Sequence, residues 1–121
     1  MENHKYHILI VEDDKEIRDG VEIYLKNQGY QVWKAANGKE GLEIVAQEEI
    51  HLAILDIMMP VMNGIVMCRK LKEDLRTSHI PIILLTAKDS LQDKEEGYQV
   101  GADSYLTKPF SATLLHSRIH N

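Results

Sequence analysis

Short apolar runs alternate along the chain with longer stretches in which apolar residues recur every three or four positions. Each apolar run predicts a short strand. The five predicted strands are Tyr6–Val11, Gln31–Ala35, Leu52–Leu55, Pro81–Leu85 and Ser104–Leu106. Three of them are continuously apolar rather than alternating, which is typical of strands buried on both faces of a parallel sheet.

The stretches between these runs have the spacing of amphipathic helices. Gly29 is expected to end the first of these helices. Leu71 and Leu75 are expected on the apolar side of the third helix. The predicted helices are Lys15–Gln28, two that open at Asn37-Gly38 and Asn63-Gly64, a weakly apolar one over Ser90–Val100, and one that Ser111 caps.

Five strand–helix pairs in this order predict an α/β fold, a flavodoxin-like (βα)5 doubly wound parallel sheet with strand order 2-1-3-4-5. In that topology the first and third strands are neighbours. Ligands of such sheets bind beyond the carboxyl ends of the strands, where the chain reverses direction. The residues that follow each strand are therefore the first place to look for chemistry.

Acidic residues follow two of these strands. Glu12, Asp13 and Asp14 come directly after the first strand, and Asp56 comes after the third. Asp14 is expected to cap the next helix. The other three carboxylates would meet in one crevice, where their like charges need compensation. Oxygen ligands of this kind suit a hard cation such as Mg²⁺, so the sequence predicts a magnesium site.

A hydroxyl and an ammonium group are predicted at the same edge of the sheet. Thr86 ends the fourth strand, and Lys108 follows the fifth. Lys108 can neutralise charge on an oxyanion, and Thr86 can donate a hydrogen bond to it. Together with the acidic residues and a metal ion, this arrangement is typical of phosphoryl transfer to a carboxylate nucleophile.

Composition narrows the possible functions. The 121 residues fit one domain, and a net charge of −5 disfavours direct binding to nucleic acid. No apolar run is long enough to cross a membrane, and the first ten residues do not form a secretory signal. A single cysteine, Cys68, excludes an internal disulfide and fits a cytoplasmic protein.

Four motifs carry a resemblance over essentially the whole length of the chain. They are ILIVEDD at 8–14, DIMMPVMNG at 56–64, PIILLTA at 81–87 and GADSYLTKPF at 101–110. In this order and spacing they resemble the response-regulator receiver domain of two-component systems. The stretch from residue 77 to residue 103 is especially similar to receivers of hybrid sensor histidine kinases.

The resemblance implies a role for each site residue. Asp56 would be the phosphoacceptor. Mg²⁺ (or Mn²⁺) would be bound directly by Asp13, Asp56 and the backbone carbonyl of Met58, and mainly through water by Glu12. Thr86 and Lys108 would hold the phosphoryl oxygens, Tyr105 would be an aromatic switch, and the peptide bond before Pro109 would be cis.

The resemblance also implies a function, which is Mg²⁺-dependent transfer of a phosphoryl group from a kinase phosphohistidine to Asp56. The partners would be a cognate histidine kinase or phosphotransfer domain. An output domain, such as a transcription regulator, or a homodimer would use the face of the fourth helix, fifth strand and fifth helix. The domain itself would not contact nucleic acid or membrane and would not turn over as an enzyme. We expect 1–121 to be one domain of a longer protein, such as a membrane-anchored hybrid kinase.

Two details of the switch are expected. Thr86 would move toward the phosphoryl group, and Tyr105 would enter the vacated space from a solvent-facing rotamer. The charged fourth helix would be the element that is easiest to shift. Because Met58 stands where many receivers have a polar residue, and cannot orient an attacking water, we expect slow to moderate hydrolysis of the aspartyl phosphate.

Alternative functions meet specific obstacles. A haloacid-dehalogenase-type phosphatase needs an acid two residues after its nucleophile, where Met58 stands, and a flavin-binding protein would not place the acidic EDDKE near a phosphate. A receiver that has lost its chemistry would not need Thr86 and Lys108. His116 and His120 have the spacing to share a metal ion, but no third ligand is evident, and we expect no site there.

Overall fold

A parallel sheet of five strands forms the centre of the computed structural model, which describes residues 5–87 and 91–120. The strands run in the order β2-β1-β3-β4-β5, so the predicted topology is confirmed. The strands are β1 (His7–Val11), β2 (Gln31–Ala35), β3 (Leu52–Asp56), β4 (Ile82–Thr86) and β5 (Ser104–Thr107). The helices are α1 (Lys15–Asn27), α2 (Gly38–Gln47), α3 (Gly64–Glu73), α4 (Leu91–Gln99) and α5 (Ala112–His120).

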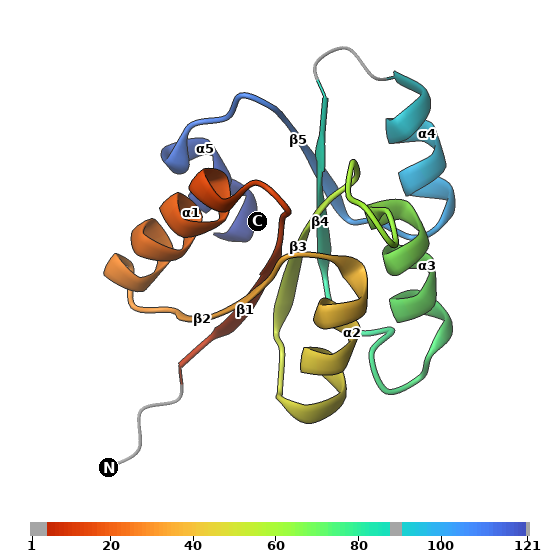
Figure 1. Ribbon diagram of the computed structural model, residues 1–121, viewed down its shortest axis with the longest axis horizontal. Coiled ribbons are helices and arrows are strands. Elements are labelled where there is room, and N and C mark those ends of the chain that lie inside the picture. Colours follow the sequence, from red (N-terminus) through yellow and green to blue (C-terminus); the bar gives the residue numbers. More distant parts are fainter. Residues whose placement is uncertain (1–4, 88–90, 121) are drawn as a thin grey trace.

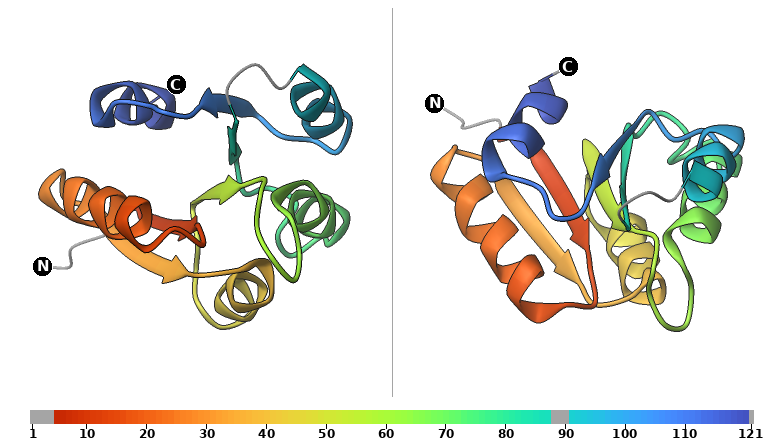
Figure 2. Two further views of the ribbon diagram at one scale, coloured as in Figure 1. Left: turned by 45° about the horizontal axis from the view of Figure 1, so that its top comes forward. Right: turned by 90° about the horizontal axis from the view of Figure 1, so that it is seen from above.

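The helices cover both faces of the sheet (Figures 1 and 2). On one face, α1 and α5 contribute Leu25 and Leu115 to one apolar cluster. On the other face, α2 and α3 pack over a second cluster that includes Met67 and Leu71. Every residue of β3 and β4 is buried, which explains why these strands are continuously apolar in the sequence.

The ends of α1 are set by its own sequence. The Asp14 side chain accepts hydrogen bonds from the backbone N–H groups of Glu16 and Ile17, which confirms the predicted cap. At the other end, Gly29 has a φ of 96°, a left-handed conformation that glycine adopts without steric cost. The chain can therefore turn directly from α1 into β2.

The predicted extent of the third helix is wrong at its end. Helix α3 stops at Glu73, and Leu75, which we placed on its apolar side, is 91 % exposed. The cause lies in the loop that follows. The Lys72 ammonium donates to the carbonyl of Ile80 at 2.7 Å, and the Thr77 hydroxyl donates to the carbonyl of Leu71 at 2.7 Å. These bonds turn the backbone away from the helix axis before Leu75 can reach the core.

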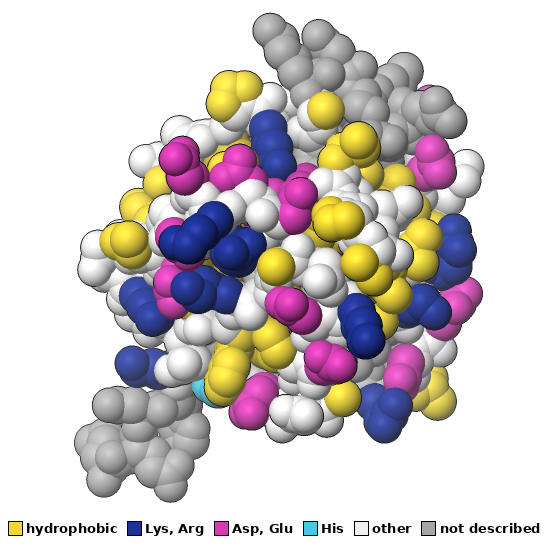
Figure 3. All heavy atoms as spheres, in the orientation of Figure 1, with side chains coloured by type: hydrophobic (Ala, Val, Ile, Leu, Met, Phe, Trp, Pro, Cys, Tyr) yellow, Lys and Arg dark blue, Asp and Glu magenta, His cyan; other side chains and the backbone are white. Residues whose placement is uncertain are grey.

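Charges of both signs are interspersed over the face seen in Figure 3. Ion pairs such as those of Lys34 with Asp19 and Glu22 offset part of the basic charge of the domain. The face therefore presents no dense basic patch of the kind that binds a phosphate backbone. Within the described ranges, none of the helices has the length and apolar character needed to span a bilayer.

Candidate functional site

Three carboxylates meet at the carboxyl ends of β1 and β3. Glu12 follows β1, Asp56 is the last residue of β3, and both are buried, whereas Asp13 is exposed. One carboxylate oxygen from each of the three lies within 4.8 Å of the others. The structure therefore brings together the acidic residues that the sequence singled out. Asp14 points away from them, into the cap of α1.

The backbone around Asp56 is tightly constrained. The N–H of Ile57 donates to the carbonyl of Leu85, and the N–H of Gly64 donates back to the carbonyl of Ile57. A Cβ atom added to Gly64 would lie 2.3 Å from the backbone oxygen of Asp56. Only glycine can therefore bring the start of α3 this close to the end of β3, and this closeness constrains the backbone that carries Asp56.

Lys108 supplies the positive charge of the site. Its Nζ atom lies 2.8 Å from Glu12 Oε1 and 3.1 Å from Asp56 Oδ1. The backbone N–H of Lys108 donates to the backbone carbonyl of Thr86, and the peptide bond between Lys108 and Pro109 is cis. The ammonium group therefore reaches the acidic residues from β5, across the ends of β4 and β3.

Two buried side-chain oxygens in the described part of the chain have no hydrogen-bond partner, and both belong to this site. They are Glu12 Oε1 and Thr86 Oγ1. The first of these oxygens lies 2.8 Å from the Lys108 ammonium, so the ion pair compensates it, whereas Thr86 Oγ1 has no such contact. A buried polar atom without a partner costs about 1–3 kcal/mol. The Thr86 hydroxyl is therefore the group of this site that an oxygen acceptor would satisfy.

Burial dominates the electrostatics of Glu12. Loss of solvent raises the pKa of Glu12 from its ordinary 4.5 to about 7, with Asp56 adding to the rise and Lys108 opposing it. Burial alone would lower the pKa of Lys108, but its contacts with Glu12 and Asp56 outweigh that effect and raise it. Without a cation, the Glu12 carboxyl group is therefore partly protonated near neutral pH.

This shift makes the stability of the metal-free protein depend on pH. Folded Glu12 holds its proton up to about pH 7, whereas unfolded Glu12 loses it near pH 4.5, so the unfolding free energy should fall as pH rises between these values. We expect a loss of roughly 1–3 kcal/mol. Urea unfolding in EDTA from pH 4.5 to 8 measures it. Glu12→Gln should flatten the slope, and saturating Mg²⁺ should stabilise the protein most above pH 7. An identical slope in Glu12→Gln would contradict the assignment.

Tyr105 does not have the solvent-facing rotamer that we expected. It is buried, and its ring packs edge-on against Tyr98 with the centroids 4.5 Å apart. Its hydroxyl lies over Gly97 of α4, where an added Cβ atom would be only 1.7 Å away. The glycine leaves the space that the ring occupies. The sequence gives no sign of this, because Gly97 and Tyr105 are brought together only by the packing of α4 on the sheet.

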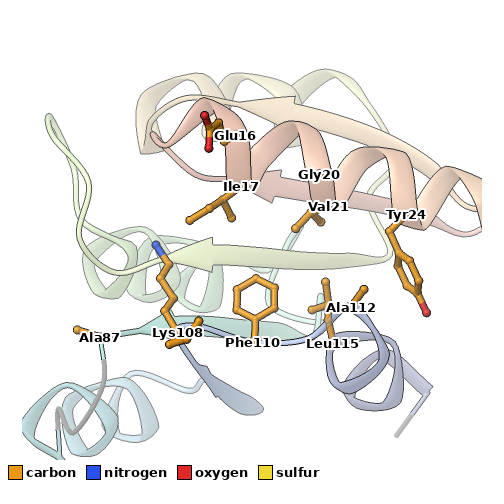
Figure 4. A pocket seen from close by; sticks show the side chains of 11 residues that line it. Glu16, Ile17, Gly20, Val21, Tyr24, Ala87, Lys108, Phe110, Ala112 and Leu115 are labelled. Atoms are coloured by element: carbon orange, nitrogen blue, oxygen red, sulfur yellow. The ribbon is translucent and has the colours of Figure 1, made fainter.

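A large pocket lies beside the acidic cluster rather than in it. A pocket of about 650 Å³ opens between α1 and the segment after β5, with Ile17 and Tyr24 on one side and Phe110 and Leu115 on the other (Figure 4). Lys108 also lines this pocket. The remaining walls are mostly apolar and unsuited to an ion. The pocket thus provides an apolar surface next to the ammonium group, and the polar chemistry stays with the carboxylates.

Comparison with known proteins identifies the family. A model of the response regulator receiver domain matches residues 8–120. Regulatory protein VanR of Enterococcus faecium is 50 % identical over 113 residues, which are 93 % of this chain and 47 % of that protein. A histidine kinase of Formosa agariphila is 45 % identical over 120 residues, which are 99 % of this chain and 9 % of that protein. The chain thus spans about half of the first relative and a small part of the second.

A solved structure agrees with these matches. The receiver domain protein (CheY-like) of Methanospirillum hungatei has a TM-score of 0.90 and 33 % identity, and the alignment covers 96 % of this chain and 91 % of that one. The relatives include both a transcriptional regulator, from Synechocystis, and a histidine kinase. The chain belongs to the response regulator receiver domains of two-component signalling systems.

Proposed function

We propose that the domain accepts a phosphoryl group on Asp56 from a phosphohistidine, and that the added charge changes the conformation of its surface. The observation that carries the proposal is the convergence of three carboxylates beside the Lys108 ammonium, next to the buried and unpaired Thr86 hydroxyl. A phosphoryl group on Asp56 offers acceptor oxygens to Thr86, and a cation offers charge to Glu12. These two additions complete the site.

The transfer itself requires one nucleophile and one leaving group. A carboxylate oxygen of Asp56 attacks phosphorus, a P–O bond forms, and the N–P bond to the donor imidazole breaks. The departing nitrogen keeps the electron pair and takes up a proton. Lys108, 3.1 Å from Asp56 Oδ1, stabilises the charge that develops on the transferred oxygens. The Thr86 hydroxyl is free to donate to one of them.

The three converging carboxylates fit Mg²⁺ or Mn²⁺, because these hard cations prefer oxygen ligands. Asp13, Asp56 and the carbonyl of Met58 would bind the ion directly, and Glu12 would act mainly through water. When bound, the cation supplies charge that offsets the carboxylates and the phosphoryl oxygens. The residues of the chain hold it in place: Lys108 keeps Glu12 and Asp56 oriented even without it.

The conformational change would pass from the site to the surface through Thr86, Tyr105 and α4. Thr86 and Leu84 point to the same face of β4, and a Cβ on Gly97 would contact both Leu84 and Tyr105. A movement of Thr86 toward the phosphoryl group would therefore disturb the packing beneath α4. Among residues 95–99 of α4, only Gly97 is buried, so few side-chain contacts hold this part of the helix in place. The face of α4, β5 and α5 is the proposed output surface.

The partners follow from this chemistry and from the relatives. The phosphodonor would be a histidine kinase or a phosphotransfer domain, and the output would be a linked domain, including a transcription regulator, or a second copy of the domain. The VanR protein and the histidine kinase are both longer than this chain, which supports one receiver domain at 1–121 within a longer cytoplasmic or membrane-anchored protein. The domain would modify only itself.

Labelling with acetyl phosphate tests the proposal. With Mg²⁺ present, intact-mass measurement should show one phosphoryl group per chain, and EDTA should prevent its addition. Hydroxylamine should remove the label, because it attacks acyl phosphates and leaves phosphoesters intact. A folded protein that gains no label with Mg²⁺ would instead be a receiver that acts only as a binding module. A label that resists hydroxylamine would also contradict the proposal.

The lifetime of the aspartyl phosphate is expected to depend on Met58. This side chain is 68 % exposed beside the site and has no group that can orient a water molecule. Met58→Asn supplies such a group and should shorten the half-life by about tenfold. The loss of label after removal of acetyl phosphate measures it. Leu75→Asn, at an even more exposed position outside the site, is the control. A half-life of seconds in the unmodified protein would refute slow hydrolysis.

A further inference from the structure

A second group of metal-binding side chains lies on the face formed by α1 and α5, outside the acidic site. The Nε2 atoms of His116 and His120 are 2.9 Å apart. The Tyr30 hydroxyl, from the segment between α1 and β2, lies 3.2 Å from the first and 3.4 Å from the second. The third donor that the sequence did not reveal is thus contributed by a residue far away in the chain.

The triangle of donor atoms has the size of one face of a coordination polyhedron. With metal–ligand bonds of about 2.1 Å, neighbouring ligands are about 3.0 Å apart in an octahedral site and about 3.4 Å apart in a tetrahedral one. The three edges measured here, 2.9, 3.2 and 3.4 Å, match this range. An ion above this triangle can therefore lie at bonding distance from all three atoms, once the rings turn their nitrogen lone pairs toward it.

The donors are held by packed elements rather than by a loose surface. Leu115 and Ile119, which flank the two histidines on α5, are buried in the core. The His116 ring packs edge-on against Tyr24 and Tyr30, with centroids 6.0 and 5.8 Å apart. The backbone N–H of Tyr30 donates to the carbonyl of Leu25. His120 is exposed, so coordination positions remain open to solvent or to a ligand from another molecule.

We propose that His116, His120 and Tyr30 form a second cation site, which binds a divalent transition metal of the Zn²⁺ type and ties the end of α5 to the segment between α1 and β2. Imidazole nitrogens prefer Zn²⁺, Ni²⁺ and Cu²⁺, whereas Mg²⁺ prefers oxygen ligands. The two cation sites therefore differ in the ions they select. A phenol oxygen is a weaker ligand for such ions than an imidazole nitrogen, so Tyr30 contributes less to binding than the two histidines.

The competing interpretation is a hydrogen-bonded cluster in which the two imidazoles share one proton. Titration with Zn²⁺ separates the two. Saturating Mg²⁺ is present throughout so that the acidic site is occupied. Calorimetry should then show one Zn²⁺ per chain. His116→Gln and His120→Gln should each weaken binding about 100-fold or more, because each leaves a single tethered imidazole. Tyr30→Phe should weaken it about tenfold, and His79→Gln should leave it unchanged.

A second measurement locates the ion. Substoichiometric Cu²⁺ should broaden the amide NMR signals of the last turn of α5 and of residues 28–31, and leave those of residues 12–14 and 56 sharp. His120 is exposed, so its variant keeps the test valid if His116→Gln fails to fold. Three results would overturn the proposal: no Zn²⁺ binding by the unmodified protein, equal binding by the His116→Gln/His120→Gln double variant, or broadening centred on the acidic site.

Discussion

Asp56→Asn is expected to abolish labelling by acetyl phosphate. The amide that replaces the carboxylate has no nucleophilic oxygen and cannot form an acyl phosphate. Asp56 is buried at the end of β3, and its constrained backbone holds it in a place that neither Glu12 nor Asp13 can take over. We therefore expect no label at the Mg²⁺ and acetyl phosphate concentrations that saturate the unmodified protein, as measured by intact mass.

A matched control separates the loss of the nucleophile from the loss of a negative charge. Asp19→Asn makes the same chemical change on the surface of α1, where Asp19 pairs with Lys15 and Lys34. Its labelling should equal that of the unmodified protein. Asp56→Asn should also unfold at a higher urea concentration in EDTA, because it removes one of the crowded carboxylates. A label that persists in a folded Asp56→Asn variant would show that another residue accepts the phosphoryl group.

Lys108→Met is expected to have the second largest effect. The substitution keeps an unbranched side chain of nearly the same length but removes the ammonium group beside Glu12 and Asp56. The phosphorylation rate at saturating acetyl phosphate should fall by about 100-fold or more, since a charged group that stabilises the transferred oxygens is lost. Rapid quenching followed by intact mass measures the rate.

The same variant should lose stability in a pH-dependent manner. Without the ammonium group, the charged form of Glu12 is less favourable, so the metal-free variant should lose about 1–3 kcal/mol at pH 8. At pH 5 Glu12 is already protonated in the folded protein, and the loss should be smaller. Lys26→Met, which breaks an exposed ion pair with Glu22, is the control and should change stability by less than about 1 kcal/mol. Equal losses for Lys108→Met at both pH values would contradict the argument.

The topology could be predicted from the sequence because the hydrophobic period is a local property, and five strand–helix pairs commonly adopt this strand order. The continuously apolar runs of β3 and β4 indicate burial on both faces, and the fold then places Glu12 and Asp56 side by side. What the sequence could not predict depends on contacts between distant residues. Leu75 fits the helical pattern, but Lys72 and Thr77 end the helix before it.

The same limit applies to side-chain positions around the site. The buried rotamer of Tyr105 depends on Gly97, which has no side chain and therefore no signature in the hydrophobic pattern. The third donor near His116 and His120 is Tyr30, which is 86 positions away from His116 and 90 from His120. Residue types and strand ends locate the acidic site, whereas the orientation of its neighbours follows only from packing.

The buried Thr86 hydroxyl has an evolutionary consequence. It has no hydrogen-bond partner among the described residues, and burying such a group costs roughly 1–3 kcal/mol. Thr86→Val, which nearly preserves the shape of the side chain, should make the fold more stable while it removes a donor that the proposed phosphoryl transfer needs. A variant that keeps the scaffold for binding alone is therefore one substitution away.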